Sequence, residues 1–160
     1  QKEFHRNEGR ETHTILVTPQ GQPFTQEKAK QLSGRKAVLT LICGRYEGFD
    51  ERIRSLVDEE ISGGDFICLG GEVIAMTMIE AISRIVPNML GNPESAEQES
   101  FSHSLLEYPQ YTRPASFEGM EVPEELKSGN HKIIAQWREE QALERTKNRR
   151  PDLLQCKTKS

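Results

Sequence analysis

Two short glycine-containing segments carry the residue types that could bind a small ligand. The first, Cys43–Gly48, places an arginine, a tyrosine and a glutamate between its glycines, and the second is Gly70-Gly71-Glu72. Because glycine has no Cβ, backbone N–H and C=O groups at such positions can contact a ligand directly. The cation, the aromatic ring and the carboxylate of the first segment add charge and a stacking surface. Together the two segments predict a small-molecule site.

Each glycine segment follows an apolar run and precedes a helical pattern. The runs Lys36–Ile42 and Asp65–Leu69 are predicted as buried strands. Asp50 can cap a helix after the first glycine segment, and apolar residues recur at helical spacing from Glu72 until Pro87 ends the pattern. Loops at the carboxyl ends of neighbouring parallel strands form the ligand crevice of an open α/β sheet. An α/β fold with a parallel sheet is therefore expected.

Earlier in the chain, one more strand and one more helix are predicted. The run His13–Val17 is predicted as a strand, and the turn residues Thr18–Gly21 are expected to close it. Thr25 can cap a short helix that extends to about Leu32. The alternation of strands and helices thus covers residues 13 to 90.

The remainder of the chain has a different pattern. Residues 91–114 contain prolines and acidic residues and are predicted to form a linker, with a short helix around Phe101–Leu106. Residues 115–160 show no strand signal, and Asn130 can cap a helix that runs to about Thr146. The side chains expected on the buried side of that helix are Ile133, Ile134 and Trp137. The expected domains are 1–90, 91–114 as linker, and 115–160.

Charge is distributed unevenly along the chain. The net charge of −4 combines −8 over residues 1–127 with +4 over residues 128–160. An acidic body with a basic C-terminal part fits a small-ligand domain joined to a nucleic-acid-binding element. Cations are also favoured near the C-terminus of a solvated helix, so charge alone leaves both interpretations open.

The cysteines and the apolar runs narrow the class of protein. Cys43, Cys68 and Cys156 form no CxxC pair, and the first two fall at the ends of predicted buried strands. Reduced thiols in a cytoplasmic protein are expected, and a cysteine metal site is not. No apolar run approaches the roughly 20 residues of a membrane span. The start at Gln1, without an initiator methionine, suggests a fragment of a longer protein.

Seven motifs occur in one order along most of the chain. They are Cys43–Gly48, Asp50-Glu51-Arg52, Gly70-Gly71-Glu72, Ala75-Met76-Thr77, Tyr111–Pro114, Glu118–Pro123 and Ser128–His131. In this order the sequence resembles the bacterial tRNA (guanine-N1)-methyltransferase family, often called TrmD. The resemblance extends from about Ile15 to Leu154.

The resemblance implies a fold and an activity. It implies an α/β domain with a parallel sheet and a SPOUT-type trefoil knot, then a linker and a small all-α C-terminal domain. It also implies a homodimer with the active site at the subunit interface. The implied reaction transfers a methyl group from S-adenosylmethionine to N1 of the guanosine on the 3′ side of the anticodon in tRNA.

The resemblance also assigns a methyl-donor site. By position, the donor would be bound by Leu16, Thr18, Pro19, Gly44, Tyr46, Glu47, Gly64, Phe66, Cys68, Gly70 and Gly71. The resemblance further implies a magnesium ion near Glu47. Without the resemblance, the glycines at 44, 70 and 71 would be interpreted as ordinary strand-to-helix turn residues, and Glu47 as a solvated loop acid. Leu69 and Ile74 depart from the family pattern beside this site.

Two catalytic residues are implied. Arg84 holds the position of the arginine that binds guanine O6, where a guanidinium would stabilise the negative charge that grows as N1 loses its proton. Alone, it reads as a surface arginine at the end of a helix. The family places an aspartate as general base just before a Ser-Phe pair, whereas this chain has Glu99 there, one methylene longer. Glu97 is a further acid nearby.

The C-terminal part is expected to hold tRNA. The residues that match the family's phosphate-contacting face in kind are Arg113, His131, Lys132, Arg138, Arg145, Arg149 and Arg150. Trp137 is interpreted as a core anchor rather than a base-stacking residue. Tyr111 is interpreted either as a packing residue or as a substrate contact.

Alternatives to an active methyltransferase remain open at this point. The family has an N-terminal portion that should precede Ile15, and the sequence is expected to lack it. The chain is therefore either part of the enzyme or a non-catalytic remnant that dimerises or binds RNA. A Rossmann-type nucleotide domain is disfavoured, because GxGxxG is absent.

Overall fold

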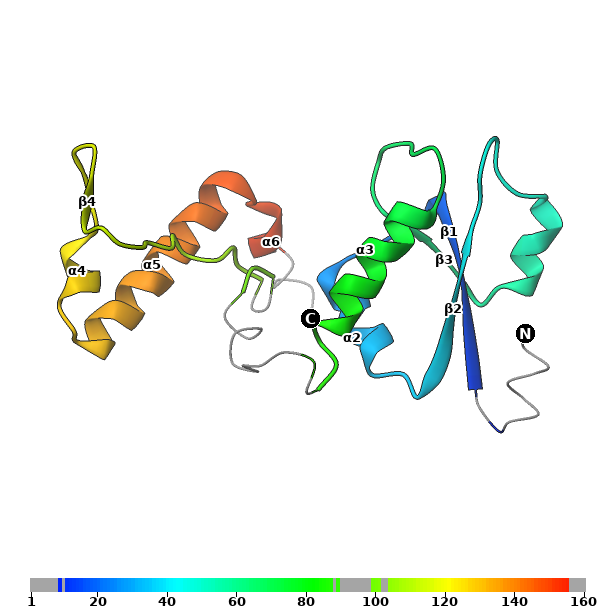
Figure 1. The fold of residues 1–160 in the computed structure, drawn as a ribbon, viewed down its shortest axis with the longest axis horizontal. Helices are drawn as coiled ribbons and strands as arrows, with labels where there is room; N and C mark the ends of the chain where they lie inside the picture. The colour runs from blue at the N-terminus through cyan, green and yellow to red at the C-terminus, as the bar shows by residue number, and fades with distance from the viewer. Residues whose placement is uncertain (1–8, 10, 88, 90–98, 102–103, 156–160) are drawn as a thin grey trace. The chain divides into compact units, whose positions relative to one another are not determined.

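The structure is a computed structural model that describes residues 9, 11–87, 89, 99–101 and 104–155. The chain divides into two compact units, residues 1–91 and residues 92–160. Figure 1 labels the strands and helices of both. In the described parts, the first unit is a parallel sheet with helices, and the second consists mainly of helices with one small hairpin.

A three-stranded parallel sheet forms the centre of the first unit. β1 (Glu11–Pro23) lies between β2 (Ala37–Cys43) and β3 (Glu59–Ser62), in the order β2-β1-β3 (Figure 1). β1 is parallel to both neighbours. This arrangement confirms the predicted α/β class and the parallel sheet.

β1 continues beyond its predicted end. Val17 and Gln22 both pair with Ile61 of β3, so the pairing register shifts between them. The residues between, Thr18–Gly21, form a bulge instead of the closing turn that the sequence suggested. The strand resumes after the bulge because its partner β3 still offers hydrogen bonds, and Phe24 N–H donates to Ser62 O at 2.8 Å. The bulge redirects the side chains at the carboxyl edge of the sheet.

The third strand lies elsewhere than predicted. Glu59–Ser62 forms it, whereas the apolar run Asp65–Leu69 is a loop. In that loop Ile67 is 81% exposed and Leu69 is 99% exposed. The strand ends because Gly64 adopts φ +146°, a conformation that only glycine adopts readily. The observed strand begins with two glutamates, so a search for apolar runs in the sequence does not find it.

Two helices cover one face of the sheet. α2 (Gln26–Ser33) begins at the predicted cap, where Thr25 Oγ1 accepts the Lys28 N–H at 3.2 Å. α3 (Glu72–Ser83) also begins as predicted and ends before Pro87. The two helices and the sheet share one core, made of Ile15, Val17, Ala29, Leu32, Ile61, Ala75, Met78 and Ile82.

The apolar residues of α3 lie on two faces. Ala75, Met78 and Ile82 are buried in the core. Val73 and Met76, which the spacing predicted to be part of a buried face, are 66% and 68% exposed. Ile79 is 54% exposed in the same way. The helix therefore presents a second apolar surface that the first unit itself does not cover.

The helix predicted after Asp50 is a short 3-10 helix, η1 (Glu51–Leu56). Its cap is confirmed, since Asp50 Oδ1 accepts the Arg52 N–H at 2.9 Å. None of its residues is buried, and Leu56 is 66% exposed, contrary to the expected apolar face. A six-residue 3-10 helix has too few turns to build such a face.

The second unit contains three helices and a hairpin among its described residues. These elements are β4 (Ser116–Phe117), β5 (Met120–Glu121), α4 (Glu124–Lys127), α5 (His131–Arg149) and α6 (Asp152–Gln155). The antiparallel pair β4–β5 corrects the expectation of a C-terminal part without strands. The pair is two residues long on each side, which is too short to give an alternating pattern in the sequence.

α5 is the main helix of the second unit. Asn130 caps it as predicted, with Oδ1 accepting the Lys132 N–H at 3.0 Å. It continues past the predicted end near Thr146, to Arg149. Its buried residues are Ala142 and Thr146, and the predicted Ile134 and Trp137 are half-buried. Of the three predicted side chains only Ile133 departs from the prediction, since it is 44% exposed.

No helix occurs among the described residues of the stretch 99–112, where one was predicted around Phe101–Leu106. Phe101 has φ +73° and Ser104 has φ +59°, which are incompatible with a right-handed helix. The stretch instead packs on α5, since Leu106 N–H donates to Thr146 Oγ1 at 2.8 Å. Tertiary contacts with α5 thus override the local preference. No helix in the described parts of the chain has both the length and the apolarity needed to cross a membrane.

Candidate functional site

The two glycine segments lie side by side, as the sequence predicted. Gly71 N–H donates to Gly44 O at 3.0 Å. Arg45 and Gly70 form an antiparallel bridge, and Arg45 Nε donates to Glu72 Oε1 at 2.6 Å. The hydrogen bond from Arg45 lowers the pKa of the Glu72 carboxyl, so the pair stays ionised. The carboxyl end of β2 is thereby joined to the start of α3.

Glycine is required by the packing at two of these positions. A Cβ at Gly44 would lie 2.4 Å from Cε2 of Phe49, and a Cβ at Gly71 would lie 3.2 Å from Cα of Cys43. A side chain at Gly71 would press on the contact between the loops, whereas one at Gly44 would displace the Phe49 ring within its own segment. The interpretation as ordinary turn glycines is therefore incomplete, because Gly71 also permits the close approach of two loops.

A pocket of about 510 Å³ opens at this edge of the sheet. Its volume falls within the range of typical cofactor and small-ligand sites. Three loops surround it: the bulge of β1, the segment after β2, and the segment between β3 and α3. The lining residues are Val17–Gln20, Gly44–Phe49, Glu51, Arg54, Ser62–Gly64, Phe66–Gly71 and Ile74.

The structure gathers nearly all of the predicted methyl-donor residues at this pocket. Ten of them line it, namely Thr18, Pro19, Gly44, Tyr46, Glu47, Gly64, Phe66, Cys68, Gly70 and Gly71. Leu16 does not, because it is fully buried in the middle of β1. Leu69 and Ile74, the two departures from the family pattern, also line the pocket.

Tyr46 and Glu47 occupy an exposed part of the lining. Tyr46 has φ +63°, which is uncommon for a residue other than glycine, and its side chain is 98% exposed. Glu47 is also exposed. The described residues contain no group of three or more His, Cys, Asp or Glu that could hold a metal ion. The magnesium contact of Glu47 stays a prediction.

The two described cysteines are free and differ in environment. Cys43 is half-buried at the end of β2, where burial and then the negative charge of Glu72 raise the pKa of its thiol. Cys68 is exposed in the pocket loop instead of ending a buried strand. Cys156 lies outside the described residues.

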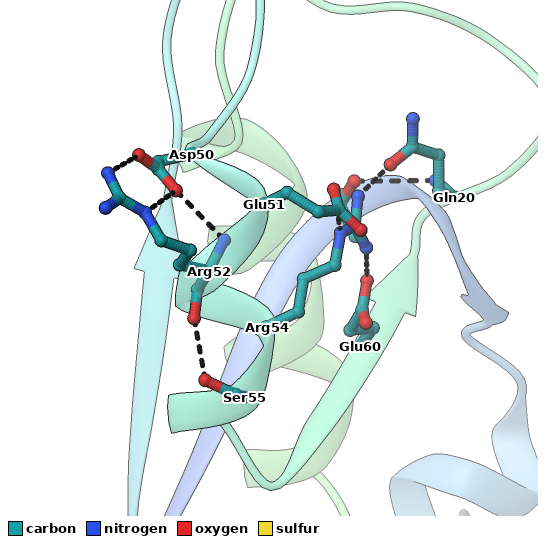
Figure 2. A network of polar contacts seen from close by, with 8 residues as sticks. Gln20, Asp50, Glu51, Arg52, Arg54, Ser55 and Glu60 are labelled. Carbon is teal, nitrogen blue, oxygen red and sulfur yellow. Dashed lines mark hydrogen bonds and ion pairs between the residues drawn. The ribbon is translucent and has the colours of Figure 1, made fainter.

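A polar cluster at the pocket was missed in the sequence. Arg54 Nε donates to Glu51 Oε2 at 2.8 Å, and its two terminal nitrogens donate to Glu60 and to Gln20 (Figure 2). Gln20, Glu51 and Arg54 all line the pocket. The spacing of Glu51 and Arg54, three residues apart, was the only sequence signal for this cluster.

The two predicted catalytic residues belong to different units. Arg84 follows the last turn of α3 in the first unit, where its backbone N–H donates to Glu80 O at 3.2 Å, and its side chain is exposed. Glu99 is a half-buried residue of the second unit. Neither lines the pocket. Their meeting at one substrate stays a prediction.

The predicted RNA-binding cations fall into two groups. Arg113, His131, Lys132 and Arg149 are exposed. The other three have partners within the second unit. Arg138 lies 4.7 Å from the ring centre of Tyr108, Arg145 Nη1 donates to Glu107 O at 3.0 Å, and Arg150 pairs with Asp152 at 2.6 Å.

A shallow hollow of about 820 Å³ lies beside α5 in the second unit. Its lining includes Tyr108, Tyr111, Arg113, Lys127 and Arg138. Nε of Arg138 is buried and has no hydrogen-bond partner within the described part of the chain. The hollow thus combines aromatic rings with cations.

Trp137 packs beside this hollow. Its ring centre lies 6.2 Å from that of Tyr111, with the two planes inclined at 56°. Such tilted pairs are a common stabilising arrangement of aromatic side chains. The contact supports the interpretation of Trp137 as an anchor and gives Tyr111 a packing role.

Comparison with known proteins identifies relatives of this chain. The sequence model of the family described as tRNA (Guanine-1)-methyltransferase TrmD matches residues 2–156. Curated proteins named tRNA (guanine-N(1)-)-methyltransferase are similar to it. The protein from Syntrophotalea carbinolica is 60% identical over 144 residues, which cover 90% of this chain and 58% of the relative.

Two further relatives carry the same name. The protein from Sorangium cellulosum is 60% identical over 144 residues, covering 88% of this chain and 54% of the relative. The protein from Staphylococcus epidermidis is 56% identical over 155 residues, which cover 96% of this chain and 62% of the relative. The chain thus spans somewhat more than half the length of these relatives. On the family match and these identities, the chain belongs to the tRNA (guanine-1)-methyltransferase TrmD family.

Proposed function

We propose that this chain is part of an enzyme that transfers a methyl group from S-adenosylmethionine to N1 of the guanosine on the 3′ side of the anticodon in tRNA. The observation that carries the proposal is the convergence of ten predicted donor-binding residues on one pocket at the carboxyl edge of the sheet. The names of the relatives give the methylation of guanine N1 in tRNA. Because the substrate is tRNA, the proposed location is the cytoplasm.

The lining of the pocket fits the methyl donor. Glycines of the two segments line the pocket without side chains, so a ligand can approach the loop backbone closely. Phe66 and Tyr46 add flat apolar surface. Glu47 adds a carboxylate, which attracts a sulfonium cation and is also the proposed contact of a magnesium ion. Bound there, S-adenosylmethionine supplies an electrophilic methyl group.

Two side chains would act on the guanine. Glu99 would take the proton from guanine N1, so that this nitrogen could accept the methyl group that a bound donor would supply. Arg84 binds O6, where negative charge accumulates as N1 loses its proton. A guanidinium suits this role because it stays charged and donates in a fixed plane. The family pattern at Ser100-Phe101 supports Glu99 as the base.

A homodimer with the active site at the subunit interface is part of the proposal. The first unit exposes a second apolar face of α3 at Val73, Met76 and Ile79, and an apolar loop at Ile67 and Leu69. Clusters of exposed large apolar side chains mark association surfaces in soluble proteins. In the proposed dimer, the linker of one copy would deliver Glu99 to the pocket of the other. A SPOUT-type knotted path through the three pocket loops is proposed on family membership.

The second unit, which contains most of the predicted linker and the helices that follow it, would hold the tRNA. Its exposed cations Arg113, His131, Lys132 and Arg149 suit phosphate contacts, which set affinity and its dependence on salt. The hollow with Tyr108 and Arg138 offers stacking surface for an unpaired base.

Titration calorimetry with S-adenosylmethionine and S-adenosylhomocysteine tests the donor site. Saturable binding at one site per chain is expected, and its loss in a Gly71→Val variant that remains folded would place the ligand at this pocket. Absence of binding to the folded chain would contradict the donor site. RNA binding without donor binding would instead favour a non-catalytic relative that retains only the tRNA surface.

A further inference from the structure

Arg54 is the only side chain in the described part of the chain whose guanidinium joins three elements around the pocket. It lies on η1, and its partners are Glu51 on η1, Glu60 on β3 and Gln20 on the bulge of β1 (Figure 2). The side chains of Arg54 and Glu60 are only 26% and 29% exposed. Partial burial strengthens the contact between Arg54 and Glu60, whereas the contacts of Arg54 with Glu51 and Gln20 are exposed.

The bulge that Arg54 contacts is one wall of the pocket. Thr18, Pro19 and Gln20 belong both to the bulge and to the lining. The β1 ladder does not hold these residues, because its pairing with β3 shifts register across them. Gln20 N–H donates to Thr18 Oγ1 at a long distance, 3.5 Å. The side chain of Gln20 therefore depends on Arg54 for its link to the rest of the sheet.

The backbone next to Gln20 shows how closely the wall approaches β3. A Cβ at Gly21 would lie 2.5 Å from the carbonyl carbon of Glu60. The same Glu60 offers its carboxylate to Arg54. The wall thus approaches β3 closely at its backbone and is also linked to β3 through Arg54. Glu60 takes part in both contacts.

The shape of the guanidinium suits this task. Its nitrogens lie in one plane and donate in three directions, so it can serve a carboxylate on each of two elements and an amide on a third. The ammonium group of a lysine at the same place would carry all its donors on one nitrogen atom. Lysine would neutralise the carboxylates without holding all three partners.

We propose that Arg54 is a positioning residue of the methyl-donor pocket, which acts through Gln20 to hold the Thr18–Gln20 wall against η1 and β3. It is not a catalytic residue. The inference rests on the proposed function only for the identity of the ligand. The three-way contact itself is independent of any ligand.

Donor affinity tests the proposal with a matched control. Arg54→Met should weaken binding of S-adenosylmethionine by about tenfold, the cost of losing a charged hydrogen bond. Arg54→Lys should lie between Arg54→Met and the parent chain. Arg52→Met is the control, because Arg52 is on the same helix, is 90% exposed, pairs with Asp50 at 2.5 Å and is absent from the lining. It should stay within twofold of the parent chain.

A double-mutant cycle tests the route through Gln20. If Arg54 acts through Gln20, Gln20→Met and Arg54→Met together should weaken binding no more than Arg54→Met alone. A purely structural loss would not give this coupling. Additive losses, or full recovery of affinity in Arg54→Lys, would overturn the proposal.

The chain without ligand gives a second readout, which separates this inference from the proposed function. The Phe24 amide reports the docking of β1 on β3 beyond the bulge, since it donates to Ser62 O. Its hydrogen exchange should be about tenfold faster in Arg54→Met and unchanged in Arg52→Met, with the Ala29 amide of α2 as internal reference. Unchanged exchange at Phe24 would contradict the wall-holding role. If the parent chain bound no donor, the proposed function would fail, and this exchange would still decide the role of Arg54.

Discussion

The two units of this chain offer charged and aromatic groups to ligands in different ways. In the first unit, backbone and glycines at the edge of a parallel sheet form a pocket, and its arginines Arg45 and Arg54 are paired with acids. In the second unit, cations are spread along α5 and the irregular segment that contains Arg113. We therefore expect ligand binding to depend mainly on pocket shape in the first unit and on exposed positive charge in the second.

Basic residues that are neighbours in the sequence of the second unit have different side-chain partners in the structure. Arg149 and Arg150 are adjacent and both exposed, but Arg150 pairs with Asp152 and lies 5.9 Å from the ring centre of Phe101. Arg138 and Arg145 likewise have partners within the unit. Side-chain partners, which the sequence does not display, decide which cations are available to phosphate.

The largest effect on methyl transfer is expected from a change at Glu99. Glu99→Gln should lower methyl transfer by about 10²- to 10⁴-fold, because the amide cannot take the N1 proton. Single-turnover methylation of a tRNA transcript by the full-length protein measures it, with donor affinity unchanged. Glu99→Asp, which restores the family residue, should keep most of the rate. Unchanged turnover in Glu99→Gln would leave the second unit with binding alone.

A somewhat smaller effect is expected at the end of α3. Arg84→Ala should slow the same single-turnover reaction by about 10²- to 10³-fold, the usual cost of removing one donor to a developing negative charge. Arg35→Ala, at another exposed arginine of the first unit, is the control and should leave the rate unchanged. A slow rate in both variants, or in neither, would contradict the assignment of Arg84 to guanine O6.

The adjacent arginines sharpen the comparison within the second unit. Arg149→Ala should reduce the slope of log affinity for tRNA against log salt by about 1, as expected for one lost phosphate contact. Arg150→Ala should reduce it less, because Asp152 already neutralises that guanidinium. Filter binding over a salt series measures both slopes. Equal slopes would mean that the Asp152 pair opens on RNA, and a slope unchanged by Arg149→Ala would return this helix end to the solvated-surface interpretation.

The smallest effect concerns stability of the first unit in acid. Partial burial raises the pKa of Glu59, but hydrogen bonds from Lys28 and His13 outweigh it and hold the pKa below its ordinary value. A carboxyl with a lowered pKa in the folded state contributes stability above its unfolded pKa, and this is lost as pH falls through the folded pKa. Urea unfolding should therefore lose stability more steeply below about pH 4 in the parent chain than in Glu59→Gln. Equal slopes would contradict this.

Local signals in the sequence predicted features of both units. Thr25 and Asn130 cap helices as expected, and the two glycine segments meet at the carboxyl edge of a parallel sheet. These features depend on hydrogen bonds between close neighbours or on the general geometry of parallel strands, so residue types suffice to predict them. The ten donor residues were reached by resemblance to a family, and their convergence on one pocket is a finding of the structure.

The errors have a common physical origin. Asp65–Leu69 is apolar but forms a pocket loop, while Glu59–Ser62 is acidic at its start but forms the strand. In both cases the neighbour across space decides the outcome. β1 supplies hydrogen bonds to Glu59–Ser62, and Lys28 and His13 compensate the charge of Glu59.

The sequence by itself determined the class of fold, the helix starts, the position of the glycine segments and the family. Only the tertiary structure decided that β1 bulges at Thr18–Gly21, that Arg54 links this bulge to η1 and β3, and that Arg149 but not Arg150 is free of an acidic partner among the described residues. The reason is the range of the interactions. Caps and turns involve residues a few positions apart, whereas Arg54 and Gln20 are 34 positions apart and meet only once the sheet has formed.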